Sequence, residues 1–102
     1  MRGAVSPIKI EVADLEQLLL LASSMRSTII HLDEEKGLAY CFLIPIASLS
    51  PIIYYCKLDK APAERFAHIN RVTGEIRFGD KPSTEPNDIS ILMVRVRSGE
   101  TL

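Results

Sequence analysis

The segment from Leu38 to Cys56 contains nineteen residues without a charged side chain, and it restricts the possible folds more than any other feature. Its length would allow a helix that crosses a membrane. Pro45 and Pro51 lie inside it, however, and each would remove a backbone hydrogen bond from a helix at a cost of roughly 3 kcal/mol. The residues on either side of positions 47–50 are rich in aromatic and β-branched side chains. The segment therefore predicts two strands joined by a turn, and no membrane span.

The predicted hairpin brings together the two cysteines of the chain. With a turn at residues 47–50, antiparallel pairing places Cys41 directly opposite Cys56. Such residues can form a disulfide where they occupy a non-hydrogen-bonded pair. The N-terminal residues show no secretory signal, because Pro7, Lys9 and Glu11 interrupt any apolar run, so we expect an intracellular, cytoplasmic protein. We interpret Cys41 and Cys56 as a cross-strand pair of buried thiols and leave a disulfide open as the alternative.

Residues 14–25 predict the clearest helix in the chain. Asp14 can cap its N-terminus, and Gln17 stands at the position that returns a bond to the cap. Apolar residues recur at helical spacing and form one stripe, while Leu20 falls on the polar side. The pattern is that of an amphipathic helix packed on one face of a sheet.

The rest of the chain favours strands and turns. Hairpins are expected around residues 33–37, 47–50 and 72–74, with Gly37 and Gly74 supplying the positive φ angle. Residues 8–12 and 89–97 alternate as strands do, whereas residues 62–69 fit either a short helix or a strand. We therefore predict a single α+β domain over residues 1–102, with a mostly antiparallel sheet of five to seven strands.

Several kinds of chemistry find no support in the sequence. Zinc would need ligands from His31, Cys41, Cys56 and His68, the only histidines and cysteines, but their spacing lacks close ligand pairs. No nucleophile elbow, P-loop or dinucleotide fingerprint is present. We therefore expect no catalytic residues, no metal and no cofactor.

Arginines in the last third of the chain support one binding hypothesis. Arg71, Arg77, Arg95 and Arg97 could contact phosphates, and nearby aromatic residues could stack on bases. Acidic residues are interspersed among them, and the net charge of the chain is −1. A small nucleic-acid-binding domain is therefore the alternative function, and a small enzyme of unknown class is the third.

The preferred hypothesis follows from excess apolar surface. The strands at 38–44, 51–56 and 89–94 are apolar on both faces, whereas one short helix covers only one face of a sheet. A second copy of the chain would cover the other, as in the common twofold dimers. We expect a non-catalytic binding or assembly module that forms a homodimer through an apolar sheet face. The scarcity of side-chain amides mildly favours a thermophilic source.

Overall fold

The computed structural model describes residues 6–43 and 50–97. Within them the chain forms, in order, β1 (Ile8–Glu11), α1 (Leu15–Ser24), β2 (Ile29–Asp33), β3 (Leu38–Leu43), β4 (Ile52–Lys57), β5 (Phe66–Asn70), β6 (Ile76–Gly79) and β7 (Asp88–Arg95). The strands build one sheet in the order β1-β4-β3-β2-β7-β5-β6. The β1–β4 and β2–β7 pairs are parallel, and the other four are antiparallel. The predicted α+β fold, with one helix on a mostly antiparallel sheet, is confirmed.

The helix begins and ends as its local sequence dictates. The Asp14 carboxylate accepts a hydrogen bond from the Gln17 backbone N–H at 2.9 Å, which satisfies one of the unpaired N–H groups at the helix start. At the other end Arg26 adopts a positive φ of 59°, and the Ser27 N–H bonds to the Ala22 carbonyl. This is a Schellman termination with an arginine in place of the usual glycine.

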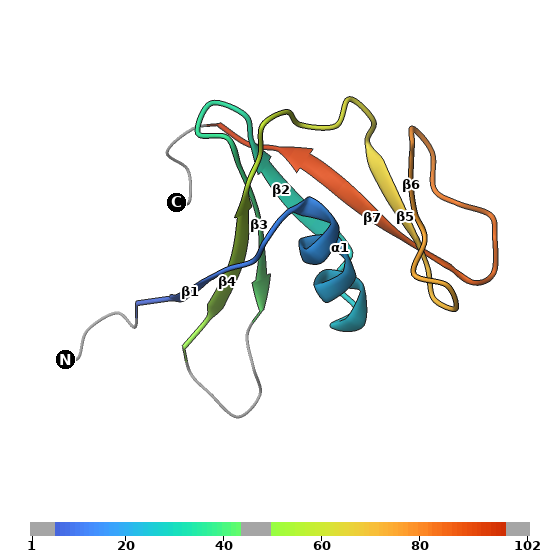
Figure 1. Ribbon diagram of the computed structural model, residues 1–102, viewed down its shortest axis with the longest axis horizontal. Coiled ribbons are helices and arrows are strands. Elements are labelled where there is room, and N and C mark those ends of the chain that lie inside the picture. Colours follow the sequence, from blue (N-terminus) through green and yellow to red (C-terminus); the bar gives the residue numbers. More distant parts are fainter. Residues whose placement is uncertain (1–5, 44–49, 98–102) are drawn as a thin grey trace.

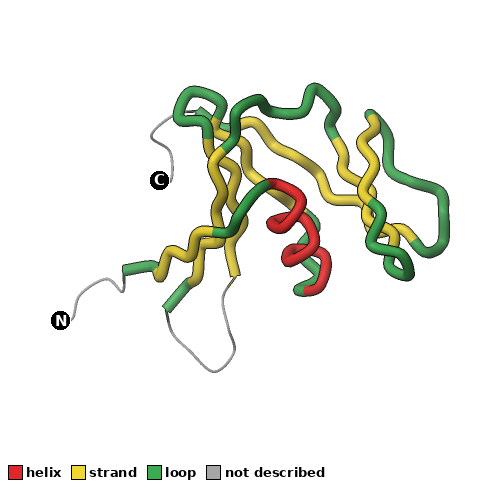
Figure 2. Tube along the Cα trace, in the orientation of Figure 1, coloured by secondary structure: helices red, strands yellow, loops and turns green. Residues whose placement is uncertain are grey.

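The core lies between α1 and the sheet. The sheet curves around the helix, which lies between the β3–β4 and β5–β6 hairpins (Figures 1 and 2). The helix residues Leu18, Leu19 and Ala22 are fully buried against the sheet. From the sheet, the helix-side core contains Ile30, Leu32, Ala39, Cys41, Cys56, Ala67, Ile69, Ile91 and Met93. Leu20, expected on the polar side of the helix, is 38% exposed.

Two predicted hairpin turns are confirmed by the backbone. Gly37, between β2 and β3, has φ 67°, and Gly74, between β5 and β6, has φ 76°. The Asn70 side chain caps the second turn by accepting the backbone N–H groups of Val72 and Thr73, each at 2.9 Å. The question over residues 62–69 is also answered, because β5 begins at Phe66 and residues 62–65 are irregular.

The β3–β4 hairpin is present, but its predicted register is wrong. Cys41 pairs with Tyr54, and Cys56 pairs with Ala39, so the two cysteines are diagonal rather than directly opposite. The difference is two residues along the strand. Such a shift returns every side chain to the same face, so the apolar pattern could not detect the error. The predicted turn at 47–50 falls mostly on residues 44–49, which lie outside the described residues.

Candidate functional site

The sheet face opposite α1 is covered by no helix within residues 6–43 and 50–97. Residues paired across a ladder point to the same side of a sheet, so the register identifies the side chains of this face. We call it the open face and define it by Ile29, His31, Tyr40, Phe42, Ile53, Tyr55, Phe66, Leu92 and Val94. None of these nine side chains is charged, and the charged residues that the register places on the same side of the sheet lie around them: Lys9, Glu11, Asp33, Lys57, Arg77 and Asp88. The open face is therefore an apolar and aromatic surface that crosses five strands.

Three rings form the centre of the open face. The His31 ring stacks on Tyr40 with 5.1 Å between centroids and an interplanar angle of 15°. Phe42 meets both rings edge to face, at 5.4 Å from His31 and 5.6 Å from Tyr40. Such offset and edge-to-face contacts are favoured by the ring quadrupoles. We call these three residues the aromatic cluster.

The open face is unevenly shielded from solvent. Tyr40 and Ile53 are buried, whereas Phe42 is 41% and Ile29 is 42% exposed. Charged side chains border the face along β1, where Lys9 pairs with Ile53 and Glu11 pairs with Tyr55. An apolar centre with a charged rim is the arrangement found in protein interfaces.

A second cluster is polar and lies where β5, β6 and β7 meet. The imidazole Nδ1 of His68 lies 3.0 Å from Ser90 Oγ, and Ser90 Oγ also accepts the backbone N–H of Ser83 at 2.9 Å. The Ser83 hydroxyl donates to Asp88 at 2.6 Å. Arg77 forms an ion pair with the same carboxylate, whose side chain is fully shielded from solvent. These bonds hold the loop of residues 80–87 against β7.

The polar cluster contains a serine next to a histidine, as a nucleophile and its base would be. The Asp88 carboxylate, however, bonds to Ser83 and Arg77 and makes no described bond to the imidazole. His68 is only 7% exposed, and its Nε2 lies 3.0 Å from the position that a Cβ on Gly79 would take. The cluster therefore positions a loop, and its geometry does not form a triad.

We expect Asp88→Asn to lower stability at neutral pH and to reduce its dependence on acid. The hydrogen bond from Ser83, aided by Arg77, lowers the pKa of Asp88 below its ordinary value. A lowered pKa stabilises the fold above the unfolded-state pKa of about 4, and that contribution is lost as the pH falls further. Urea unfolding of both proteins between pH 7 and pH 3 should show their difference shrinking below about pH 4.

Asp80→Asn is the matched control, because Asp80 lies in the same loop but is exposed. It should unfold with the same pH dependence as the wild type. A gap between the wild type and Asp88→Asn that stays constant down to pH 3 would contradict the role of the ionised carboxylate.

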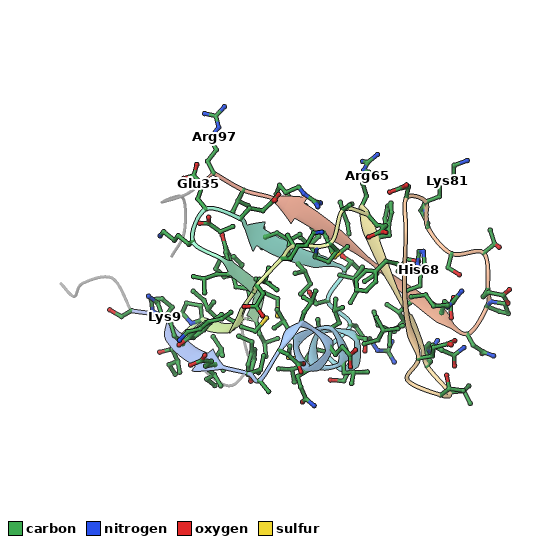
Figure 3. All side chains as sticks on the ribbon, turned by 45° about the horizontal axis from the view of Figure 1, so that its top comes forward. Lys9, Glu35, Arg65, His68, Lys81 and Arg97 are labelled. Carbon is green, nitrogen blue, oxygen red and sulfur yellow. The ribbon has the colours of Figure 1, made fainter. Side chains whose placement is uncertain are left out.

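The structure does not gather the four arginines considered for nucleic acids. Arg77 pairs with Asp88 at the start of β7, and Arg95 pairs with Glu34 at the end of that strand. Seven residues of strand separate these ends, which is roughly 23 Å. Arg71 lies in the β5–β6 turn, and Figure 3 shows Arg97 beside the β2–β3 turn. The four residues therefore form no single basic patch.

The cysteines and histidines lie on opposite faces of the sheet. Cys41 and Cys56 are buried free thiols on the helix side, whereas His31 and His68 point to the other side. Burial raises the pKa of both thiols, that of Cys56 to about 11. Within the described part of the chain, no three His, Cys, Asp or Glu side chains are placed to hold a metal ion. The four ligands considered for zinc are thus not brought together.

A shallow cavity of about 560 Å³ lies beside the C-terminal end of α1. Arg26 and Arg71 line it together with small polar residues of the helix end, and neither histidine is among its lining residues. It therefore contains no acid or base next to a nucleophile.

Comparisons with known proteins add no assignment. No family model matches the chain, and searches of curated proteins and of solved structures find no match either. In the described residues, no helix has the length and apolar character needed to cross a membrane.

Sequence reasoning missed the two clusters for different reasons. The aromatic cluster joins neighbours across the β2–β3 hairpin, whose turn was predicted, so pairing His31 with Tyr40 would have revealed it. The polar cluster depends on the parallel and antiparallel neighbours of β7, and no local pattern specifies them.

Proposed function

We propose that this protein is a non-catalytic assembly module whose copies pair through the open face. The observation that carries the proposal is the half-exposed Phe42 and Ile29 beside the aromatic cluster, at the uncharged centre of a face whose charged side chains lie around it. Removing this apolar surface from water is favourable by about 25 cal/mol per Å². Pairing would bury this apolar surface on both copies, so both would contribute this free energy.

A second copy is the partner that suits this face best. The apolar centre of the open face is complementary to itself, since its residues need no opposite charge on the partner. A twofold axis through the aromatic cluster would bring Phe42 of each copy to the other open face, and twofold dimers are the commonest oligomers. Aromatic residues at the centre of an interface also supply much of its binding energy.

Phe42→Asp is expected to halve the mass of the assembly, because it buries an unpaired carboxylate at the centre of the contact. Sedimentation velocity over a range of concentrations measures this directly. Phe78→Asp is the matched control, since Phe78 is 40% exposed but points to the helix side of β6. The control should keep the wild-type mass.

Two results would contradict the proposal. One is a wild-type protein that sediments as a monomer at every concentration. The other is a Phe42→Asp protein that is folded by circular dichroism and retains the wild-type mass.

A further inference from the structure

The free edge of β1 is the feature from which we draw a further inference. β1 ends the strand order, and within residues 6–43 and 50–97 it pairs with β4 alone. All four of its residues are exposed, including Ile8 at 48% and Ile10 at 37%. An edge strand offers unpaired backbone groups to another strand, and charge and proline at an edge limit which strands can pair with it. In β1, Ile8 and Ile10 alternate with Lys9 and Glu11, so a partner strand must match these charges.

Hydrogen bonds to β4 determine which backbone groups face outward. Ile8 donates its N–H to Pro51, and Val12 donates to Tyr55. Backbone groups of successive strand residues point to alternate sides, so the N–H and C=O groups of Lys9 and Glu11 point away from β4. The backbone groups of these two residues are therefore the ones that can exchange hydrogen bonds with another strand at the free edge.

Only one antiparallel register of two β1 edges pairs opposite charges. Residues with outward backbone groups must face one another to exchange hydrogen bonds. The possible pairings are Lys9 with Lys9, Glu11 with Glu11, or Lys9 with Glu11 of the second copy. The first two place like charges opposite each other, which is destabilising. The third forms two opposite-charge pairs and places Ile10 against Ile10 on the twofold axis.

We propose that β1 binds β1 of a second copy of this chain, antiparallel, with Lys9 of each copy opposite Glu11 of the other. The pairing joins the two sheets into one continuous sheet. It uses the outward backbone groups of β1 and does not depend on the proposed function. The side chains of Lys9 and Glu11 also border the open face, so recovery in the double variant and in the mixture identifies edge pairing. If both contacts form and their twofold axes are perpendicular and intersect, the assembly closes as a tetramer in which each contact accounts for one halving of the mass; any other placement of the axes gives longer assemblies.

Charge reversal at the edge tests the proposal without touching the core. Lys9→Glu places Glu opposite Glu twice, and Glu11→Lys places Lys opposite Lys twice. Each single variant should weaken edge pairing roughly tenfold or more. Sedimentation velocity at low salt should show half the wild-type mass for each. The double variant Lys9→Glu/Glu11→Lys restores the opposite charges and should recover the wild-type mass.

Mixing the two single variants provides a stricter test. Lys9→Glu carries two acidic residues on the edge and Glu11→Lys carries two basic ones, so together they should form mixed pairs although neither pairs with itself. Glu35→Lys and Lys81→Glu are the matched controls and should leave the mass unchanged. Both positions are exposed, and Figure 3 shows them away from Lys9, with Lys81 at the opposite end of the molecule.

The outcomes separate the edge contact from the open-face contact. Single reversals that halve the mass, with recovery in the double variant and in the mixture, support edge pairing whatever Phe42→Asp does. Reversals that leave the mass unchanged overturn it, as does a double variant that fails to recover. A loss of mass confined to Phe42→Asp would leave the open face as the sole contact and would also overturn edge pairing.

Discussion

Leu19→Ala is expected to lower the free energy of unfolding by about 2–5 kcal/mol. Leu19 is fully buried, and α1 is the helix that covers the inner face of the sheet. The substitution removes apolar atoms and leaves a cavity that a short helix can close only by moving. Domains of this size have a total stability of about 5–15 kcal/mol, so the loss would be a large fraction of it.

Leu20→Ala is the control for this experiment. Leu20 is the next residue of the same helix but is 38% exposed, so the same chemical change should cost less than about 1 kcal/mol. Urea unfolding at one protein concentration compares the two variants, because association would otherwise add to the apparent stability. Equal costs for the two variants would contradict the packing of α1 on the sheet.

The second large effect is on thiol chemistry. Burial, and to a smaller extent the negative charges of Asp14 and Glu11, raise the pKa of Cys56 to about 11. Burial raises the pKa of Cys41 in the same direction. At pH 8 the reactive thiolate of Cys56 is then roughly a hundredfold scarcer than on an ordinary cysteine. Steric protection slows its reaction further.

We expect both thiols to react with a disulfide reagent such as dithionitrobenzoate only after unfolding. The folded protein should show almost no reaction within minutes. After addition of guanidinium chloride, each chain should release two equivalents of the thionitrobenzoate anion, one for each cysteine. A Ser24→Cys variant supplies the control, because residue 24 is exposed and its thiol should react at an ordinary rate. Two results would contradict the burial of free thiols at Cys41 and Cys56. One is a reaction of the folded protein within tenfold of the Ser24→Cys rate, and the other is the absence of any reactive thiol in denaturant.

Local signals predicted the elements whose causes are local. Asp14 caps the helix that its sequence position indicated, and Gly37 and Gly74 occupy the left-handed conformation in the turns where they were expected. Each depends on a few neighbouring residues. The two-sided apolar character predicted for β3 and β4 likewise appears, within Leu38–Leu43 and Ile52–Lys57, as a helix-side core and an open face.

What could not be predicted depends on residues far apart in the chain. Parallel pairing of β1 with β4, and of β2 with β7, has no sequence signal of its own, because the partners share neither a turn nor a spacing. The register of the Cys41 hairpin failed for another reason. A shift by two residues buries the same side chains, so only the turn distinguishes the alternatives.

The candidate sites also differ in whether local sequence signals could predict them. The aromatic cluster lies within a hairpin that the sequence indicates, so a pairing argument could reach it. The polar cluster requires Asp88 and Ser90 of β7 to meet His68 of β5 and Arg77 of β6, which only the complete strand order brings about. The four arginines were grouped by closeness in sequence, and the sheet separates them.

The position of β7 has a consequence for the order of folding. It is the last of the strands in the described residues, yet it joins β2 to β5 and so connects the two parts of the sheet. During synthesis one side of β2 therefore stays unpaired until β7 has left the ribosome. Ribosome-bound chains that stop before β7 should be more sensitive to protease and more prone to aggregate than those that include it.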